Sequence, residues 1–290
     1  MTPISHREEF LFLYDVTMAN PNGDPLEENK PRIDEASGLN LVTDVRLKRT
    51  IRDHFHDAMG HDGRGGRDIF VRQTASDKGT GIKDGKARVK DFGDDSEAIL
   101  ARCIDIRLFG GVLPLNKRSF TFTGPAQLKM GRSLHRVHLM HLRGTGAFAS
   151  SDGNQQNTFR DEYILPYSLI CFYGVINEHA AKHTGLGRDD VDLFYEAMWE
   201  GTRNLLSRSK MGHMPRFLLR LRHGDPNFFI GDLDHLVRFR SELDDEAIRK
   251  HEDGLLDLSA LAEELAKHED RIETIEIRQD ERLKVVGWNR

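Results

Sequence analysis

The chain has 290 residues, with 42 Lys and Arg against 47 Asp and Glu, and a formal net charge of −5. Its 38% hydrophobic share is enough to build a core and excludes an intrinsically disordered chain. No apolar run approaches about eighteen residues, which excludes a membrane-spanning helix. The two cysteines give no disulfide framework, and an acidic pair stands where a signal peptide would be apolar. We therefore expect a cytoplasmic protein.

The net charge is unevenly distributed along the chain. Residues 241–290 carry fifteen acidic against eight basic residues, a net of −7, which leaves +2 for residues 1–240. Two windows, residues 106–151 and 201–224, contain basic residues and no acidic residue at all. A run of charge is usually a solvated surface, but two acid-free windows that also hold Gly, Ser, Thr and aromatic residues favour an anionic partner.

The first part of the chain predicts a strand, a loop and a helix. Residues 9–17 are almost continuously apolar, which is typical of a strand buried on both faces. Residues 20–38 are rich in Pro, Gly, Asn and Asp and predict a long loop. Thr43 is placed to cap a helix that runs to about residue 56. The residues of this helix that face the core recur every four positions: Leu47, Ile51 and Phe55.

The middle of the chain predicts mostly strands. Residues 68–73, 104–108 and 120–123 are expected to form short strands, the last two because apolar and polar side chains alternate. Residues 74–95 are polar and glycine-rich, which predicts a mobile segment. Residues 130–160 read as a β stem followed by a loop of small residues.

The last third predicts a helix, a strand and an acidic tail. An apolar stripe that begins after Asp189 and includes Phe194 and Met198 has helical spacing. Residues 215–222 alternate sharply between apolar and basic side chains and predict a strand. The tail predicts an acidic amphipathic helix, with Leu258, Leu261 and Leu265 on one side, and a terminal strand at residues 273–277.

The order strand, helix, strands, helix and strand is that of a ferredoxin-like unit with large insertions. We therefore predict an α+β fold. Residues 1–240 are expected to form one elaborated domain with insertions at about residues 20–40, 74–95 and 130–160. Residues 241–290 are expected to pack on the same domain.

Motifs for phosphate binding and nucleophilic catalysis fail on spacing. Five residues separate Gly79 from Gly85 and Ala87 follows Lys86, so the segment is not a P-loop. Ser207 and Lys210 match an S-x-x-K pattern, but the other motifs of that enzyme class are missing. No catalytic residue and no cofactor are predicted.

Two groups of residues could suggest a metal site. His135, His138 and His141 would lie on alternating faces of a strand and could not converge on one ion without a partner. The loop after the first strand could offer hard oxygen ligands from its acidic residues, Asp24, Glu27, Glu28, Asp34 and Glu35. A solvated loop that forms turns explains this acidic composition more simply, so we predict no metal site.

Seven segments, in one order, carry a resemblance to a known family. They are NPNGDPLEENKPRID from Asn20, TDVRLKRTIRDHF from Thr43, IRLFGGVLP from Ile106, FTGPAQLKMGRSLHRV from Phe122, GTGAFAS from Gly144, EYILPYSL from Glu162 and SRSKMGHMPR from Ser207. Together they resemble the CRISPR-associated family seven protein, the repeated backbone subunit of the Cascade surveillance complex, in a form similar to type I-B. The resemblance covers about residues 8–240 and says least about the acidic tail.

This resemblance implies a modified RRM-like, or ferredoxin-like, palm with inserted finger and thumb elements, the thumb being a β-hairpin. It implies a non-catalytic subunit that polymerises along the crRNA spacer in a helical filament and presents the spacer for pairing with target DNA in antiviral defence. The implied partners are crRNA, target DNA through crRNA pairing, further copies of the chain and other Cascade subunits, with no membrane. A subunit that accepts any guide should contact phosphate and ribose rather than base edges.

The candidate RNA-binding residues lie in four groups. The first predicted helix supplies a row of cations, Arg46, Lys48, Arg49 and Arg52. The stem and tip of the predicted hairpin region supply Arg132, Ser133, His135, Thr145, Gly146 and Phe148. The short-side-chain cationic loop before residues 215–222 supplies Ser207, Arg208, Ser209, Lys210, Met211 and Gly212. Small residues in such a loop let backbone N–H groups approach a phosphate closely.

Two other classes of function stay open at this point. Type III relatives cut target RNA with an Asp in the loop after the first strand, so a metal-dependent ribonuclease that uses Asp24 or Asp34 is one alternative. A protein-interaction scaffold whose basic windows bind acidic partners is the other. Such a scaffold should stay oligomeric when RNA is digested away, whereas an RNA-binding filament should not.

Overall fold

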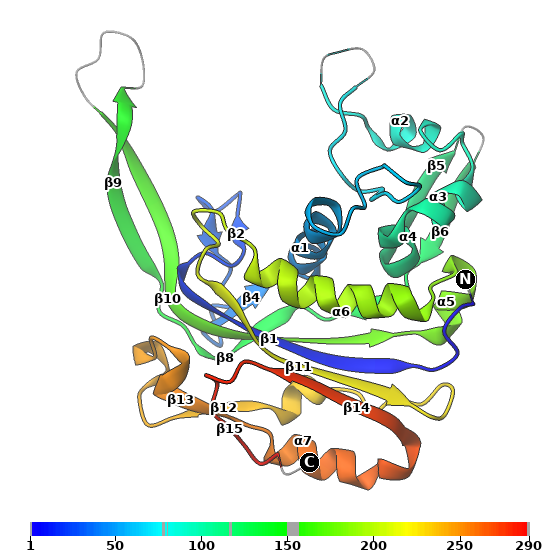
Figure 1. The fold of residues 1–290 in the computed structure, drawn as a ribbon. Helices are drawn as coiled ribbons and strands as arrows, with labels where there is room; N and C mark the ends of the chain where they lie inside the picture. Colours follow the sequence, from blue (N-terminus) through cyan, green and yellow to red (C-terminus); the bar gives the residue numbers. More distant parts are fainter. Residues whose placement is uncertain (1, 77–78, 80, 116–117, 150–156, 289–290) are drawn as a thin grey trace.

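The computed structural model describes the whole chain except residues 1, 77–78, 80, 116–117, 150–156 and 289–290 (Figure 1). It is an α+β protein built on a central antiparallel sheet with the strand order β14-β11-β1-β10-β8-β4. In chain order these strands are β1 (Glu8–Ala19), β4 (Leu39–Val42), β8 (Gly131–Arg136), β10 (Asn157–Ile176), β11 (His213–His223) and β14 (Ile272–Gln279). No helix in the described part of the chain is long and apolar enough to cross a membrane.

Strand β1 is buried on both faces from Glu8 to Val16, as predicted. Alternate side chains enter two different cores because successive residues of a strand point to opposite faces. Phe10 and Phe12 belong to one core, and Leu11 and Leu13 belong to the other. The sheet therefore divides the molecule into two layers.

Helices α1 (Asp44–Asp57) and α6 (Arg188–Arg203) cover the first face of the sheet (Figure 1). Leu47, Ile51 and Phe55 of α1 are buried, which confirms the predicted core face. Thr43 is the N-cap residue of α1, but its hydroxyl donates to the Asn22 side chain instead of capping the helix. The stripe predicted for α6 is confirmed as well, because its apolar residues Val191, Phe194, Tyr195 and Met198 are buried.

The C-terminal segment covers the opposite face. Strands β12 (Arg238–Ser241), β13 (Gly254–Asp257) and β15 (Val285–Val286) form a small sheet beside helix α7 (Ser259–Lys267). Leu258, Leu261 and Leu265 are buried in the same core as Leu219 of β11. The predicted tail helix and terminal strand are confirmed, and that strand, β14, extends the central sheet along β11.

A β-hairpin projects from the sheet beside the short strands β2 (Gly23–Asp24) and β3 (Lys30–Pro31) (Figure 1). It consists of β9 (Met140–Ala149) and the first part of β10, with Ile164 opposite Met140 and Arg160 opposite Gly144. The rest of β10 lies in the central sheet against β1. The β stem predicted within residues 130–160 is therefore confirmed.

An insertion between α1 and β8 corrects two predictions. Residues 104–108 belong to helix α4 (Ile104–Phe109), not to a strand. Their polar residues, Asp105 and Arg107, are buried in ion pairs instead of facing solvent, so the apparent apolar-polar alternation did not mark an exposed face. Residues 68–73 hold only an isolated bridge between Asp68 and Cys103, not a strand.

The same insertion contains four further elements. Helix α2 (Gly85–Lys90) lies inside the segment predicted to be mobile, capped by the Asp84 side chain, which accepts a hydrogen bond from the Ala87 N–H. Helix α3 (Ser96–Arg102) follows it. Strands β5 (Gly110–Leu115) and β6 (Arg118–Thr123) form a hairpin, which confirms a strand at residues 120–123. The remaining short elements of the chain are β7 (Ala126–Leu128) and α5 (Glu178–Thr184).

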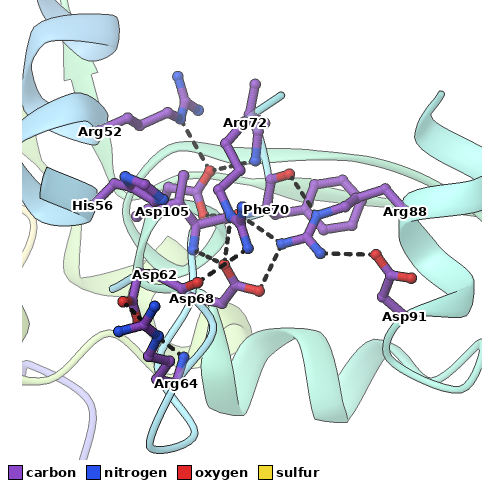
Figure 2. A network of polar contacts seen from close by, with 12 residues as sticks. Arg52, His56, Asp62, Arg64, Asp68, Phe70, Arg72, Arg88, Asp91 and Asp105 are labelled. Atoms are coloured by element: carbon purple, nitrogen blue, oxygen red, sulfur yellow. Dashed lines mark hydrogen bonds and ion pairs between the residues drawn. The ribbon is translucent and has the colours of Figure 1, made fainter. Parts of the chain in front are cut away.

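A buried polar network attaches this insertion to α1 (Figure 2). The fully buried Asp105 carboxylate accepts from the backbone N–H groups of Phe70 and Val71, at 2.8 and 3.1 Å, and from Arg52 Nε at 3.0 Å. Asp68 accepts from Arg88 at 2.7 Å in the same network. One carboxylate therefore satisfies two backbone donors and one cation from two separate parts of the chain.

We expect Asp105→Ala to lower the free energy of unfolding by about 3 kcal/mol, because it leaves an arginine and two buried N–H groups without their acceptor. Urea unfolding followed by circular dichroism measures this loss. The matched control is Asp53→Ala, which breaks the exposed Arg49–Asp53 pair and should cost less than about 1 kcal/mol. Equal losses in the two variants would contradict the role given to Asp105.

Candidate nucleic-acid interface

The four basic residues of α1 differ in their partners. Lys48 pairs with Asp44 at 2.8 Å, Arg49 with Asp53 at 2.7 Å and Arg52 with the buried Asp105 at 3.0 Å. Arg46 has no ion pair with any residue that the structure describes, and it is half-buried. The predicted row of four cations therefore reduces to one uncompensated guanidinium and three neutralised cations.

Residues 207–212 connect α6 to β11 and lie against the end of β1. The Thr17 N–H donates to the Gly212 carbonyl, and the Asn20 N–H donates to the Ser209 carbonyl, both at 3.0 Å. A Cβ on Gly212 would lie 1.9 Å from the Thr17 carbonyl oxygen, so only glycine allows this close approach. The packing of two backbones thus fixes where the side chains of this loop can point.

The ammonium group of Lys210 is placed by this packing. It donates to the backbone carbonyl of Pro21 at 3.0 Å and to that of Asn20, and the described residues offer it no carboxylate. Burial, together with the nearby charge of Arg46, lowers the pKa of Lys210 to about 7. Burial likewise lowers the pKa of Arg46. Arg46 and Lys210, referred to below as the cation pair, are two neighbouring, partly buried positive charges, and neither forms an ion pair with a described carboxylate.

A neutral histidine supports the cation pair from inside. The ring of His213 lies 5.6 Å from the ring of Tyr14, and its Nδ1 contacts the Lys210 carbonyl. Burial is the main cause that lowers the pKa of His213 to about 3, so the ring is neutral and donates its Nδ1 proton to that carbonyl. His213 therefore fixes the Lys210 backbone without adding charge.

The other residues of the connecting loop are more exposed. Ser207, Arg208 and Met211 face solvent, whereas Ser209 and Gly212 are half-buried. Arg208 pairs with Glu162 of β10 at 2.8 Å. The loop thus presents small polar and apolar groups beside the cation pair.

The candidates on β8 are placed differently from the prediction. Ser133 and His135 are each only 3% exposed. Ser133 Oγ accepts from the Asn40 N–H and donates to the His135 carbonyl, and the His135 ring stacks on Tyr167. Both side chains are engaged inside the protein rather than at its surface, and their contact with RNA stays a prediction.

Arg132 is exposed on β8 but faces acidic residues that lie between β11 and β12. Its guanidinium lies 3.5 Å from Asp234 and 3.1 Å from the ring of His235. Lys129 contacts Asp234 and Asp232 nearby, the former at 3.1 Å. The first acid-free window is therefore partly neutralised by acids that are distant in the sequence.

The hairpin candidates lie on β9. Thr145 pairs with Phe159 of β10 in the strand register, and Gly146 and Phe148 follow it toward the end of β9. The side chains of Thr145, Gly146 and Phe148 fall outside the described part of the chain. Their contribution to RNA binding stays a prediction.

The acidic residues of the first loop form turns, as predicted. Asp24 pairs with Arg32 and accepts from the Leu26 N–H at 3.0 Å, and Asp34 accepts from the Ser37 hydroxyl. Glu28 accepts from the Tyr163 hydroxyl at 2.9 Å. Among the residues that the structure describes, no three His, Cys, Asp or Glu side chains group together as a metal site would require.

Sequence reasoning did not distinguish Arg46 from the other cations of α1, although a signal was present. An acid stands four residues from Lys48 and four residues from Arg49, at Asp44 and Asp53, where a helix brings them into contact. The residues four positions from Arg46 are Val42 and Thr50, which carry no charge. No sequence pattern indicated that backbone carbonyls would hold the Lys210 ammonium group.

Comparison with known proteins identifies the family. Residues 6–259 match the family described as CRISPR-associated protein Cas7. The "CRISPR-associated protein Cas7" of Haloferax volcanii is 30% identical over 309 aligned positions, which cover 97% of this chain and 88% of that protein.

Two solved structures share the fold. A chain of a "CRISPR RNA-guided surveillance complex, pre-nicking" superposes with a TM-score of 0.58 at 13% identity, over 97% of this chain and 96% of its own length. A chain of a "CRISPR RNA-guided surveillance complex" gives 0.50 at 14% identity, over 92% and 87%. With the family match and the 30% identical relative, the conclusion is that the chain belongs to the Cas7 family of CRISPR-associated proteins.

Proposed function

We propose that this protein is a non-catalytic backbone subunit of a type I CRISPR surveillance complex, similar to type I-B Cascade, that binds crRNA independently of its sequence. Membership of the Cas7 family supports this role, as does the fold that it shares with chains of RNA-guided surveillance complexes. The observation that carries the proposal is the cation pair, two adjacent half-buried charges that make no ion pair with any acidic residue in the described part of the chain.

The sheet supports the palm assignment within this proposal. The order β11-β1-β10-β8, with α1 and α6 on one face, corresponds to a ferredoxin-like or RRM-like unit. The opposite face, on which ordinary RRM domains stack bases, is covered here by the C-terminal segment. We therefore assign RNA binding to the end of β1 and the start of α1, not to the open face of the sheet.

The projecting elements fit the remaining parts of the proposal. In this assignment the β9–β10 hairpin is the thumb, and the insertion that contains α2, α3, β5 and β6 is a finger (Figure 1). Copies of the subunit would stack along the guide, each thumb reaching the next copy, and leave stretches of the guide free to pair with target DNA. Other Cascade subunits would close the ends of the filament.

Electrostatics explain why the cation pair suits a phosphate. Burial of a charge without a partner is costly, and an oxyanion that enters supplies the missing partner. A charge-assisted hydrogen bond to phosphate is about twice as strong as a neutral one. The backbone of single-stranded RNA carries this same group at every nucleotide, whatever the base, so the contact is independent of sequence.

We expect Arg46→Met and Lys210→Met each to weaken binding of single-stranded guide RNA by about tenfold, and equally for guides of unrelated sequence. Each loss should also reduce the slope of log K against log salt by about 0.7, the value for one phosphate contact. Fluorescence anisotropy over a potassium chloride series measures both quantities. Arg49→Met is the matched control, because Arg49 is exposed and already paired with Asp53. A loss confined to particular guide sequences would count against the proposal.

RNA binding should depend on pH through Lys210, whose pKa is about 7 in the free protein. A bound phosphate holds the proton on Lys210, so affinity should be constant below pH 6 and fall as the pH rises through 7 toward 8.5. The Lys210→Arg variant stays charged and should bind equally across this range. In the RNA-free protein, stability changes with pH in the direction opposite to that of RNA affinity. The depressed pKa makes the free energy of unfolding rise between pH 7 and about 10.5, because the unfolded chain then binds the extra proton. A flat affinity profile for the wild-type protein would contradict this assignment.

A metal-dependent ribonuclease is the competing function. We expect RNA complementary to the bound guide to stay intact when it is incubated with the assembled protein and Mg²⁺, because Asp24 is engaged by Arg32 and by a backbone N–H. Gel electrophoresis of end-labelled RNA reports the outcome, with Asp24→Ala and Asp34→Ala as matched variants. Cleavage that either variant abolishes would overturn the non-catalytic assignment.

A further inference from the structure

Two exposed methionines, Met18 and Met211, lie in the segments that meet where β1 ends and β11 begins. Val16 is opposite His213 in the register, and backbone hydrogen bonds continue this pairing from Thr17 to Gly212 and from Asn20 to Ser209. Met18 and Met211 lie between these two hydrogen bonds, one on each segment. Their side chains are unusually accessible for apolar residues, at 52% for Met18 and 73% for Met211.

The backbone of Met18 is itself unusual. Its φ of 48° lies in the left-handed region, which costs free energy for a residue with a side chain. Glycine would adopt this conformation without strain, yet the position holds a long apolar side chain. Strained backbone of this kind concentrates at binding and catalytic sites, so the positive φ of Met18 makes its side chain a candidate for ligand binding.

The two methionines border the cation pair. Met211 follows Lys210 directly, and Met18 stands two residues before Asn20, whose carbonyl accepts from the Lys210 ammonium. The surface therefore combines an apolar patch with an uncompensated positive charge. Single-stranded RNA offers the matching sequence of groups, since each phosphate is followed by a base that has an apolar face.

We propose that Met18 and Met211 form an apolar subsite that holds a nucleobase of the RNA whose phosphate is bound by Arg46 and Lys210. This inference rests on the proposed function and adds a non-ionic component to it. Thioether side chains are flexible and polarizable, so they can adapt to any of the four bases. A subsite of this kind strengthens binding and preserves its independence from sequence.

The chemistry of the patch favours RNA over a protein partner. Two methionines provide much less apolar area than the roughly 800 Å² per partner that a stable protein interface buries. The unpaired charges next to them would have to be desolvated against an apolar partner, whereas a nucleotide supplies the counter-charge itself. A second copy of the chain is therefore the less suitable occupant.

Oxidation of methionine in the full-length protein tests the subsite directly. Hydrogen peroxide converts exposed methionine to the sulfoxide, which mass spectrometry quantifies for each residue. We expect a mixed-sequence RNA of about eight nucleotides to slow oxidation of Met18 and Met211 at least threefold. Met130 is the internal control and should be oxidised equally with and without RNA. It is 49% exposed and directly precedes β8, which β10 separates from β1 in the sheet.

Two variants separate base contact from structure. Met18→Ala combined with Met211→Ala should weaken RNA binding about tenfold and leave the salt slope unchanged, because no phosphate contact is lost. Met18→Gly removes the side chain and relieves the backbone strain, so it should weaken RNA binding while the protein becomes no less stable to urea.

Each outcome decides between the two proposals. RNA that binds without protecting Met18 and Met211 overturns the subsite and leaves the proposed function intact. A changed salt slope in the double alanine variant would also overturn the subsite, because it would show that the methionines act through phosphate contacts. Protein that binds no RNA at all overturns the proposed function and the subsite together.

Discussion

The enclosure of β1 is the constraint on which the rest of the structure depends. This strand has partners along both edges, β10 and β11, and it is covered on both faces by separate cores. Its buried carboxylates form ion pairs, Glu8 with Arg220 at 3.0 Å and Asp15 with Arg216 at 2.8 Å. Only beyond Val16 does the strand reach the surface, where it meets the 207–212 loop. Lys210, Met18 and Met211 lie at this end of β1, where backbone hydrogen bonds join the strand to the 207–212 loop.

Much of this arrangement follows from periodicity in the sequence. Helices α1 and α6 could be predicted because their apolar residues recur at helical spacing, and β11 could be predicted because Phe217 and Leu219 alternate with basic residues. The strand prediction for residues 104–108 was wrong because Asp105 and Arg107 are polar and yet buried. Periodicity assumes that charged side chains face solvent, and it fails where a fold encloses ion pairs. Such pairs depend on residues far along the chain, as Arg107 depends on Asp190.

The candidate site could be predicted only as a set of basic residues. Separation of the chain at residue 240 gave the first part a positive charge, but Arg132 faces Asp234, an acid of the same part that is distant from it in the sequence. Arg52 is likewise neutralised by an acid that lies 53 positions away. What distinguishes Arg46 and Lys210 is that neither forms an ion pair with a described carboxylate, and a linear sequence does not state which groups are in contact. His135 shows the same limitation, since its burial depends on two residues that are distant in the sequence, Tyr167 of β10 and Phe239 of β12.

The enclosure of β1 also has a consequence for the order of events during synthesis. At about 5–20 residues per second, the ribosome needs roughly ten to forty seconds to produce β10 and β11 after β1 has emerged. During this interval an apolar strand with two open edges is available to any other nascent chain. Glu8, Glu9 and Asp15 then carry unpaired negative charges that oppose association of the strand with a copy of itself. The three carboxylates that the folded protein encloses in ion pairs and hydrogen bonds would thus protect the growing chain before their partners exist.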